Sequence, residues 1–219
     1  MGQNSILNQE QKLILQEFSQ NDFLLANFYF TGGTALSEVY FQHRESVDLD
    51  FFTPGTYDPQ LILNLISNWS RSHNFTFEAQ FVEPTQIYIL SFKNGRKLKV
   101  DFGPYPYKSL AEKTSYQKIK VDSKLDIAAN KLALISSQRS EVKDFVDLYF
   151  LLQEFSLWDL VECVKTKFNF HIEPFILASD FLTVEEFDFL PLMLKPLTLP
   201  QLKNFFTKKA EKLGKSKVE

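Results

Sequence analysis

The chain has 219 residues and a mass of 25.5 kDa, which is enough for one large domain or two small ones. Hydrophobic residues make up 44% and charged residues 23%, so the composition excludes a disordered chain. No apolar run approaches the roughly 18 residues of a membrane span, and Met1–Ile6 has neither region of a signal peptide. One cysteine and three histidines exclude an internal disulfide and disfavour a zinc enzyme. We therefore expect a cytoplasmic protein that does not contact membranes.

Charge is distributed unevenly along the chain. Residues 91–131 hold 10 basic and 4 acidic side chains, and residues 195–219 hold 7 and 2, whereas 1–90 and 132–194 are acidic. Such blocks can form a basic face that suits phosphate-rich partners, although on charge alone ordinary local bias on a solvated surface is the favoured explanation.

The hydrophobic pattern predicts an N-terminal half that mixes helices and strands. In chain order we expect a helix over 8–20, a strand over 27–31, a helix over 34–42, a strand over 46–52, a helix over 58–71, and strands over 75–82, 87–93 and 96–102. Asn94-Gly95, between the last two strands, is a strong hairpin signal.

From Ser123 onward the pattern is helical, with helices predicted over 123–137, 140–155 and 157–168 and a final basic helix opened by Leu199-Pro200. Ser156 and Thr183 each begin a four-residue stretch that fits a capping box. We therefore predict an α/β (α+β) fold, with a mixed sheet in an N-terminal core over 1–122 and a helical region over 123–219 packed on it.

The first candidate for chemistry is the glycine turn Thr31-Gly32-Gly33-Thr34. A strand that turns through two glycines into a helix points backbone N–H groups outward at the positive end of the helix, where phosphate binds, and Thr34 can add a hydroxyl. Any strand-to-helix turn can use these residues, so the motif alone is also compatible with a structural role.

The second candidate is the pair Asp48 and Asp50 on a predicted strand. Positions i and i+2 of a strand share a face, so the two carboxylates lie together, and the apolar flanks predict a buried strand where unpaired like charges are costly. A divalent cation such as Mg²⁺ removes that cost. Asp101, at the end of a later strand, can supply a third carboxylate for metal-assisted phosphoryl chemistry.

The third candidate is Lys131 on the predicted helix 123–137, with Arg139, Lys143, Asp144 and Asp147 close behind. Asp144 and Asp147 share a helix face, and Lys143 and Asp147 are spaced for an ion pair. A solvent-exposed, salt-bridged helix face is the alternative interpretation of this segment.

Two blocks of residues resemble the AbiEii/AbiGii-type nucleotidyltransferases, toxin components of abortive-infection and other toxin–antitoxin systems within the DNA polymerase β-like nucleotidyltransferase superfamily. The resemblance covers roughly residues 28–152. The first block is Gly32-Gly33-Thr34-Ala35-Leu36, Tyr40, His43-Arg44, Ser46 and Asp48-Leu49-Asp50-Phe51-Phe52; the second is Ile119-Lys120-Val121, Leu125 to Leu134, Arg139 and Lys143 to Tyr149.

The resemblance implies a role for each matching residue. It implies nucleotide binding by Gly32, Gly33 and Thr34, metal binding by Asp48, Asp50 and Asp101, a triphosphate contact by Lys131, an essential acidic role for Asp144, and softer phosphate contacts by Arg44 and Arg139. On this interpretation we expect the Lys131 ammonium to point into an open phosphate pocket.

The resemblance further implies a Mg²⁺- or Mn²⁺-dependent enzyme that moves NMP from an NTP to an acceptor hydroxyl. RNA, such as the 3′ end of tRNA, is one acceptor that it suggests, and a cognate antitoxin is a further expected partner. The basic blocks would then bind the RNA backbone. Two alternatives remain at this point: a nucleotidyltransferase that modifies a drug or metabolite, and a catalytically silent binding module of the same fold.

Overall fold

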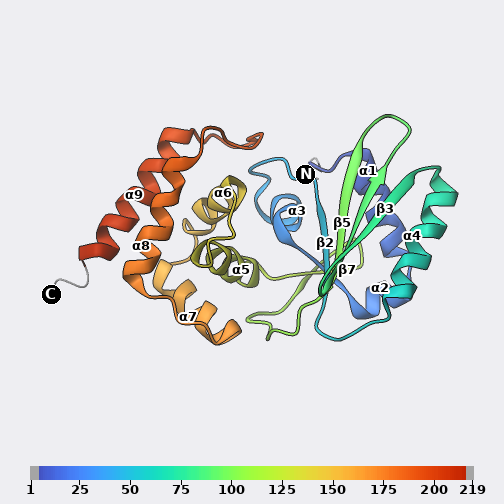
Figure 1. The fold of residues 1–219 in the computed structure, drawn as a ribbon, viewed down its shortest axis with the longest axis horizontal. Helices are drawn as coiled ribbons and strands as arrows, with labels where there is room; N and C mark the ends of the chain where they lie inside the picture. The colour runs from blue at the N-terminus through green and yellow to red at the C-terminus, as the bar shows by residue number, and fades with distance from the viewer. Residues whose placement is uncertain (1–4, 216–219) are drawn as a thin grey trace. The chain divides into compact units, whose positions relative to one another are not determined.

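The computed structural model describes residues 5–215 (Figure 1). Residues 1–4, on which the expectation about a signal peptide partly rests, lie outside the described residues. Residues 216–219, the end of the basic block 195–219, also lie outside them. The chain forms two compact units. The first, here called the sheet unit, holds the chain up to Val39, Ser46–Tyr107 and Lys113–Asp122; the second, the helical unit, holds Tyr40–Glu45, Lys108–Glu112 and the chain from Ser123 on.

A mixed seven-stranded sheet forms the centre of the sheet unit, in the order β3-β4-β5-β2-β1-β7-β6. β2 runs parallel to β5 and β1 runs parallel to β7, whereas the other neighbours are antiparallel. The mixed sheet confirms the expected α/β class. The strands are β1 (Tyr29–Thr31), β2 (Leu49–Thr53), β3 (Thr76–Val82), β4 (Thr85–Ser91), β5 (Lys97–Pro104), β6 (Thr114–Tyr116) and β7 (Ile119–Val121).

The helices of the sheet unit are α1 (Gln9–Ser19), α2 (Asp22–Asn27), the short α3 (Gly32–Ala35) and α4 (Pro59–His73), and α3 runs on into a π-helix, η1 (Leu36–Phe41). Figure 1 shows α1 and α4 on one face of the sheet and α3 on the other. Phe18 of α1 stacks on Phe51 of β2 with ring centroids 4.3 Å apart, and both side chains are fully buried. Aromatic packing therefore fills the α1 side of the sheet.

Local sequence signals explain most of these boundaries. The Asn8 side chain accepts a hydrogen bond from the backbone N–H of Gln11 and caps α1, and Asp58 caps α4 ahead of a proline at its first position. The hairpin predicted at Asn94-Gly95 joins β4 and β5, and Gly95 there has a φ of +82°. The left-handed backbone is the reason that glycine stands at this turn.

The helical unit contains α5 (Lys124–Ser136), α6 (Val142–Leu151), α7 (Leu157–Phe168), α8 (Pro174–Leu182), the 3₁₀ turn η2 (Thr183–Glu186) and α9 (Leu199–Lys215). The rings of Phe145, Phe181 and Phe206 are fully buried together, with Phe206 4.9 Å from Phe145 and 5.1 Å from Phe181 between centroids. In residues 5–215 no helix is long and apolar enough to cross a membrane.

Two local predictions need correction, and a third is confirmed. Residues 22–27 form α2, capped by the side chain of Asn21, so the strand expected from residue 27 begins only at Tyr29. Thr183 does not cap a helix, because α8 leads directly into η2 and the Thr183 hydroxyl donates to the carbonyl of Asp180. Ser156 does cap its helix, and its side chain accepts from the N–H of Asp159.

Candidate active site

Three carboxylates meet at one edge of the sheet unit, and we call Asp48, Asp50 and Asp101 the carboxylate edge. Asp50 of β2 and Asp101 of β5 are direct partners in the parallel register. Asp48 precedes Asp50 by two residues, and the intervening Leu49 is fully buried. Because side chains alternate along a strand and partners in register share a face, the Asp50 and Asp101 carboxylates lie on the face opposite Leu49. The placement of Asp48 on the same face stays a prediction.

The carboxylate edge has a cation of its own in Lys99, two residues before Asp101 on β5. The Lys99 Nζ lies 2.5 Å from Asp101 Oδ2. Partial burial lowers the pKa of Lys99, but the hydrogen bond to Asp101 and the charges of Asp101, Asp50 and Asp48 outweigh it and raise the pKa above its ordinary value. One ammonium group therefore interacts with all three carboxylates.

The glycine turn fits closely against this edge. Gly32 has a φ of +76°, and a Cβ at this position would overlap the Asp50 carboxylate. Only a glycine allows both the left-handed backbone and the approach of Asp50. The Thr34 hydroxyl is buried and donates to the backbone carbonyl of Asp48. Gly32 and Thr34 thus position the two aspartates, which is a structural contribution beside the predicted contact with nucleotide phosphates.

The metal prediction can be compared with the chemistry of this donor set. Carboxylate oxygens are the ligands that Mg²⁺ prefers, and the Lys99 ammonium shows that the edge attracts a cation. Within residues 5–215, however, no group of three or more His, Cys, Asp or Glu side chains is already arranged to hold a metal ion. Asp48, Asp50 and Asp101 suit Mg²⁺ or Mn²⁺ in kind, and their role as ligands stays a prediction.

A second set of charges lies in the helical unit, and we call Asp147, Asp144, Lys131, Arg44 and His43 the buried ionic cluster. Asp147 of α6 accepts hydrogen bonds at Oδ1 from Arg44 Nε at 2.7 Å and at Oδ2 from Arg44 Nη2 at 2.8 Å. The Lys131 Nζ of α5 lies 2.7 Å from Asp147 Oδ2 and 2.7 Å from Asp144 Oδ1. The two carboxylates are therefore matched by two permanent cations.

The structure corrects two expectations about these residues. Lys131 does not point into an open pocket: its side chain is buried between Asp144 and Asp147. Burial lowers the pKa of Lys131, but the two aspartates outweigh it and raise the pKa. The solvent-exposed helix face is also wrong, because Asp147 is fully buried, and Lys143 pairs with Glu141 at 3.3 Å.

Asp144 has two tasks in this cluster. One oxygen binds Lys131, and the other accepts from the backbone N–H of Glu141 at 2.8 Å, which completes a capping box at the start of α6. Asp144 thus fixes both a lysine and the start of a helix. The predicted roles of Lys131 and Asp144 toward nucleotide stay predictions.

The two arginines differ in their surroundings. Arg44 is buried, and besides its two bonds to Asp147 it donates from Nη1 to the carbonyl of Glu45 at 2.9 Å. Arg139 is exposed on the connection between α5 and α6. Of the two predicted phosphate contacts, Arg139 is the one with an accessible guanidinium.

His43 is the member of the cluster whose role the sequence did not indicate. Its Nε2 lies 2.8 Å from Asp147 Oδ1, and its ring contacts Phe41 and Phe150 edge to face. Burial lowers the pKa of His43, although Asp147 opposes this change. Burial would raise the pKa of Asp147, but Lys131, Arg44 and His43 hold it well below the ordinary value. In the sequence, only the position of His43 next to Arg44 could have indicated that both residues contact the same carboxylate.

Two solved structures share the fold of this chain. JHP933 from Helicobacter pylori is 19% identical, with a TM-score of 0.58 over 96% of this chain and 94% of that one. A candidate nucleotidyltransferase from H. pylori is 20% identical, with a TM-score of 0.58 over 97% of this chain and 99% of that one. At these identities the likeness shows the shared fold.

The family follows from sequence. The family described as "Nucleotidyl transferase AbiEii toxin, Type IV TA system" matches residues 13–215, and the chain belongs to this family. A relative from Aquifex aeolicus (strain VF5), the uncharacterized protein aq_aa25, is 35% identical over 141 residues, which is 64% of this chain and 64% of the relative. The chain thus matches a little under two thirds of that relative's length.

Proposed function

We propose that the protein is a Mg²⁺- or Mn²⁺-dependent nucleotidyltransferase that transfers NMP from an NTP to an acceptor hydroxyl, and that it is the toxin of a toxin–antitoxin or abortive-infection system. The observation that carries the proposal is the carboxylate edge, where Asp50 and Asp101 are partners in register on neighbouring strands and Asp48 interacts with the same Lys99 ammonium. Membership of the AbiEii family supports the same activity.

Asp48, Asp50 and Asp101 would hold the divalent cation. A bound cation there supplies charge stabilisation to the phosphates of the NTP. Gly32 and Thr34 keep Asp50 and Asp48 in place, so the residues of the glycine turn serve both the ligands and the nucleotide. Catalysis of this kind depends mainly on positioning and electrostatic stabilisation.

The resemblance assigns further residues of each unit to the nucleotide. Gly33 and Thr34 would contact the phosphates of the nucleotide. Arg139, whose side chain is exposed, would add a further phosphate contact. Lys131 would contact the triphosphate with its ammonium fixed by Asp144, 2.7 Å away, and Arg44 would act through Asp147. RNA, with the 3′ end of tRNA as one example, is the proposed acceptor, and a cognate antitoxin protein is the proposed regulator.

The experiment is a transfer assay with purified protein, Mg²⁺, total RNA and each NTP labelled at the α-phosphorus in turn. We expect label in RNA from one or more NTPs, and loss of labelling with Asp50→Ala. Glu78→Ala is the matched control, because it removes an exposed carboxylate from β3 of the same sheet, and it should label like the unmodified protein. Label in a small molecule and none in RNA would favour the drug or metabolite enzyme.

Growth provides the second measurement. Expression of the unmodified protein should arrest growth, and Asp50→Ala should relieve the arrest. An Asp50→Ala protein that is folded and still arrests growth would contradict the enzymatic toxin and favour the silent binding module.

A further inference from the structure

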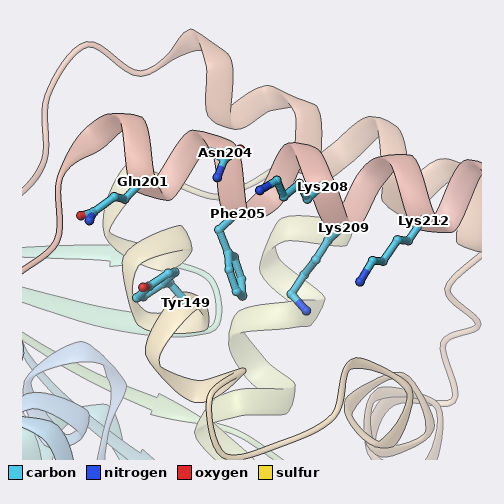
Figure 2. A pocket seen from close by; sticks show the side chains of 7 residues that line it. All are labelled: Tyr149, Gln201, Asn204, Phe205, Lys208, Lys209 and Lys212. Carbon is cyan, nitrogen blue, oxygen red and sulfur yellow. The ribbon is translucent and has the colours of Figure 1, made fainter.

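A cavity of about 380 Å³ opens in the helical unit between α6 and α9 (Figure 2). Tyr149 contributes from α6, and the other lining side chains come from one stripe of α9. Residues three and four apart on a helix share a face. The amide, aromatic and lysine side chains of this stripe therefore all line the same cavity. Among them are Asn204, Phe205, Lys208, Lys209 and Lys212.

The aromatic part of this cavity is a pair of rings. Phe205 and Tyr149 contact each other edge to face, with centroids 4.8 Å apart and planes at 69°, and both side chains are partly exposed. The neighbouring Phe206 is fully buried and anchors α9 in the core. Packing of α9 thus depends on Phe206, whereas Phe205 and Tyr149 leave aromatic surface open to a ligand.

The charged part of the cavity is basic. Three lysines line it, and no acidic side chain is among its described lining residues. The Lys209 Nζ lies 4.7 Å from the centroid of the Phe205 ring, and Figure 2 shows its ammonium beside that ring on the cavity side. Partial burial and the charge of Lys212 lower the pKa of Lys209. Lysine charges are therefore held close together, in a place that attracts an anion.

We infer that this cavity, here called the aromatic–lysine pocket, binds single-stranded RNA, with a base against the Phe205 and Tyr149 rings and the adjoining phosphates on Lys208, Lys209 and Lys212. Sites for single-stranded nucleic acid combine these two features, a basic track for the backbone and aromatic side chains for the bases. Asn204 adds a side-chain amide that can bond a base edge.

The inference deepens the proposed function and rests on it, because the bound RNA would be the acceptor. The composition of the pocket favours RNA over an acidic protein surface. Lysines alone would suit either polyanion, but the open aromatic surface and the amide match a base, which an acidic peptide lacks. Unpaired nucleotides are also the form in which a base can leave its stack and reach a ring.

Binding can be measured by fluorescence anisotropy with a 12-nucleotide single-stranded RNA of mixed sequence carrying a 5′ fluorophore, over a series of salt concentrations. Phe205→Leu keeps an apolar side chain against Tyr149 and removes the aromatic face. We expect about tenfold weaker binding from this change, since stacking of one base on a side chain contributes roughly that much. The matched control is Trp158→Leu, which removes an exposed ring from α7 of the same unit and should leave affinity unchanged.

Charge is tested separately with the double variant Lys208→Gln/Lys212→Gln. Each phosphate contact on a single strand contributes about 0.7 to the slope of log affinity against log salt, so the slope should become shallower by about 1.4. Lys165→Gln, which removes an exposed lysine of α7, should leave the slope unchanged.

Three results would overturn the inference: affinity of Phe205→Leu equal to that of the unmodified protein, an unchanged salt slope in the double variant, or competition by polyglutamate as effective as that by RNA of equal charge. The last result would assign the pocket to an acidic protein.

These outcomes are independent of the transfer assay. If RNA labelling requires Asp50 while pocket variants bind RNA normally, the proposed function stands and the pocket assignment fails. If the pocket variants lose RNA binding while no NTP labels any acceptor, the pocket assignment stands and the enzymatic proposal fails.

Discussion

The carboxylate edge of the sheet unit and the buried ionic cluster of the helical unit both concentrate charge, but they balance it differently. At the edge, the Lys99 ammonium interacts with Asp48, Asp50 and Asp101, and the Asp48 and Asp50 side chains are partly exposed. In the cluster, Asp144 and Asp147 face the Lys131 ammonium and a bidentate guanidinium, and all of these groups are buried.

This difference separates a site that can accept a charge from one that is already complete. Neighbouring carboxylates near solvent repel one another less strongly than buried ones, and they favour a bound cation. Buried charges are stable only when each has an oppositely charged partner and its hydrogen bonds. Removal of one partner leaves the other charge buried and uncompensated. The edge is thus suited to binding a metal ion, whereas the ion pairs of the cluster hold α5, α6 and the Arg44 segment of the helical unit together and fix the Lys131 ammonium.

The largest expected effect is on activity at the edge. Asp50→Ala should lower the transfer rate by about a thousandfold or more, because it removes a group that stabilises charge in the transition state. The melting temperature should stay level or rise slightly, since one of several like charges is removed. Transfer assays and calorimetry on the same preparation check both parts, and a parallel fall of activity and melting temperature would contradict the comparison.

The largest effect on stability should come from the cluster. Asp147→Ala leaves Arg44 and Lys131 without a buried partner and should lower the free energy of unfolding by about 3–5 kcal/mol. Lys131→Ala should destabilise by a similar amount because it strands Asp144 and Asp147. Urea titration measures both. Asp159→Ala, an exposed acidic residue in the first turn of α7, should cost less than about 1 kcal/mol. Equal costs at Asp147 and Asp159 would refute the structural role of the cluster.

A smaller effect is expected where the glycine turn meets the edge. Gly32→Ala adds a Cβ that overlaps the Asp50 carboxylate and must also adopt a φ of +76°. Gly95→Ala meets the same backbone strain at a φ of +82°, with no atom within 4 Å of its Cβ. We expect each to destabilise the fold by about 1–2 kcal/mol through strain, but only Gly32→Ala should weaken Mg²⁺ binding, measured by isothermal titration calorimetry. Normal Mg²⁺ binding by Gly32→Ala would show that Asp50 is not a ligand.

Acid should destabilise the cluster in two stages. Burial lowers the pKa of His43 in the folded state. As the pH drops below about 6.5, His43 is therefore protonated in the unfolded chain before it is protonated in the folded one, and the free energy of unfolding falls. The loss is at most about 1.4 kcal/mol for each pH unit. Asp147, with its pKa far below 3.8, adds a second loss below about pH 4. Urea titrations from pH 7.5 to 5 should show a flatter dependence for His43→Gln and an unchanged one for His171→Gln, which alters an exposed histidine.

Much of the edge was predictable from sequence because its determinants are local. The apolar pattern placed Asp50 on a strand, and the Asn94-Gly95 hairpin fixed the direction of β5, on which Asp101 lies. The parallel pairing of β2 with β5, which brings Asp50 opposite Asp101, joins residues about fifty positions apart and left no local signal. The role of Lys99 depends on that pairing and was missed for the same reason.

The cluster was less predictable because burial is a tertiary property. The spacing of Lys143 and Asp147 suits an ion pair on an exposed helix, and nothing local shows that Asp147 turns inward to Arg44, 103 positions away. Lys131 looked like an accessible phosphate ligand for the same reason. α2 was also missed, since a six-residue helix has too few positions for an apolar period to stand out.

The smallest expected effect concerns Lys99, a cation of the carboxylate edge. Lys99→Met keeps the unbranched chain but removes the ammonium that lies 2.5 Å from Asp101. A divalent cation and this ammonium are attracted to the same carboxylates, so the variant should bind Mg²⁺ a few times more tightly, a change of about 1 kcal/mol at a partly exposed ion pair. Lys97→Met, two residues earlier on β5 and exposed, is the matched control for loss of a positive charge and should change Mg²⁺ affinity less. Titration calorimetry without NTP measures both. Weaker Mg²⁺ binding by Lys99→Met would mean that Lys99 orients Asp101 for the metal, and equal affinities in both variants would remove Lys99 from the site altogether.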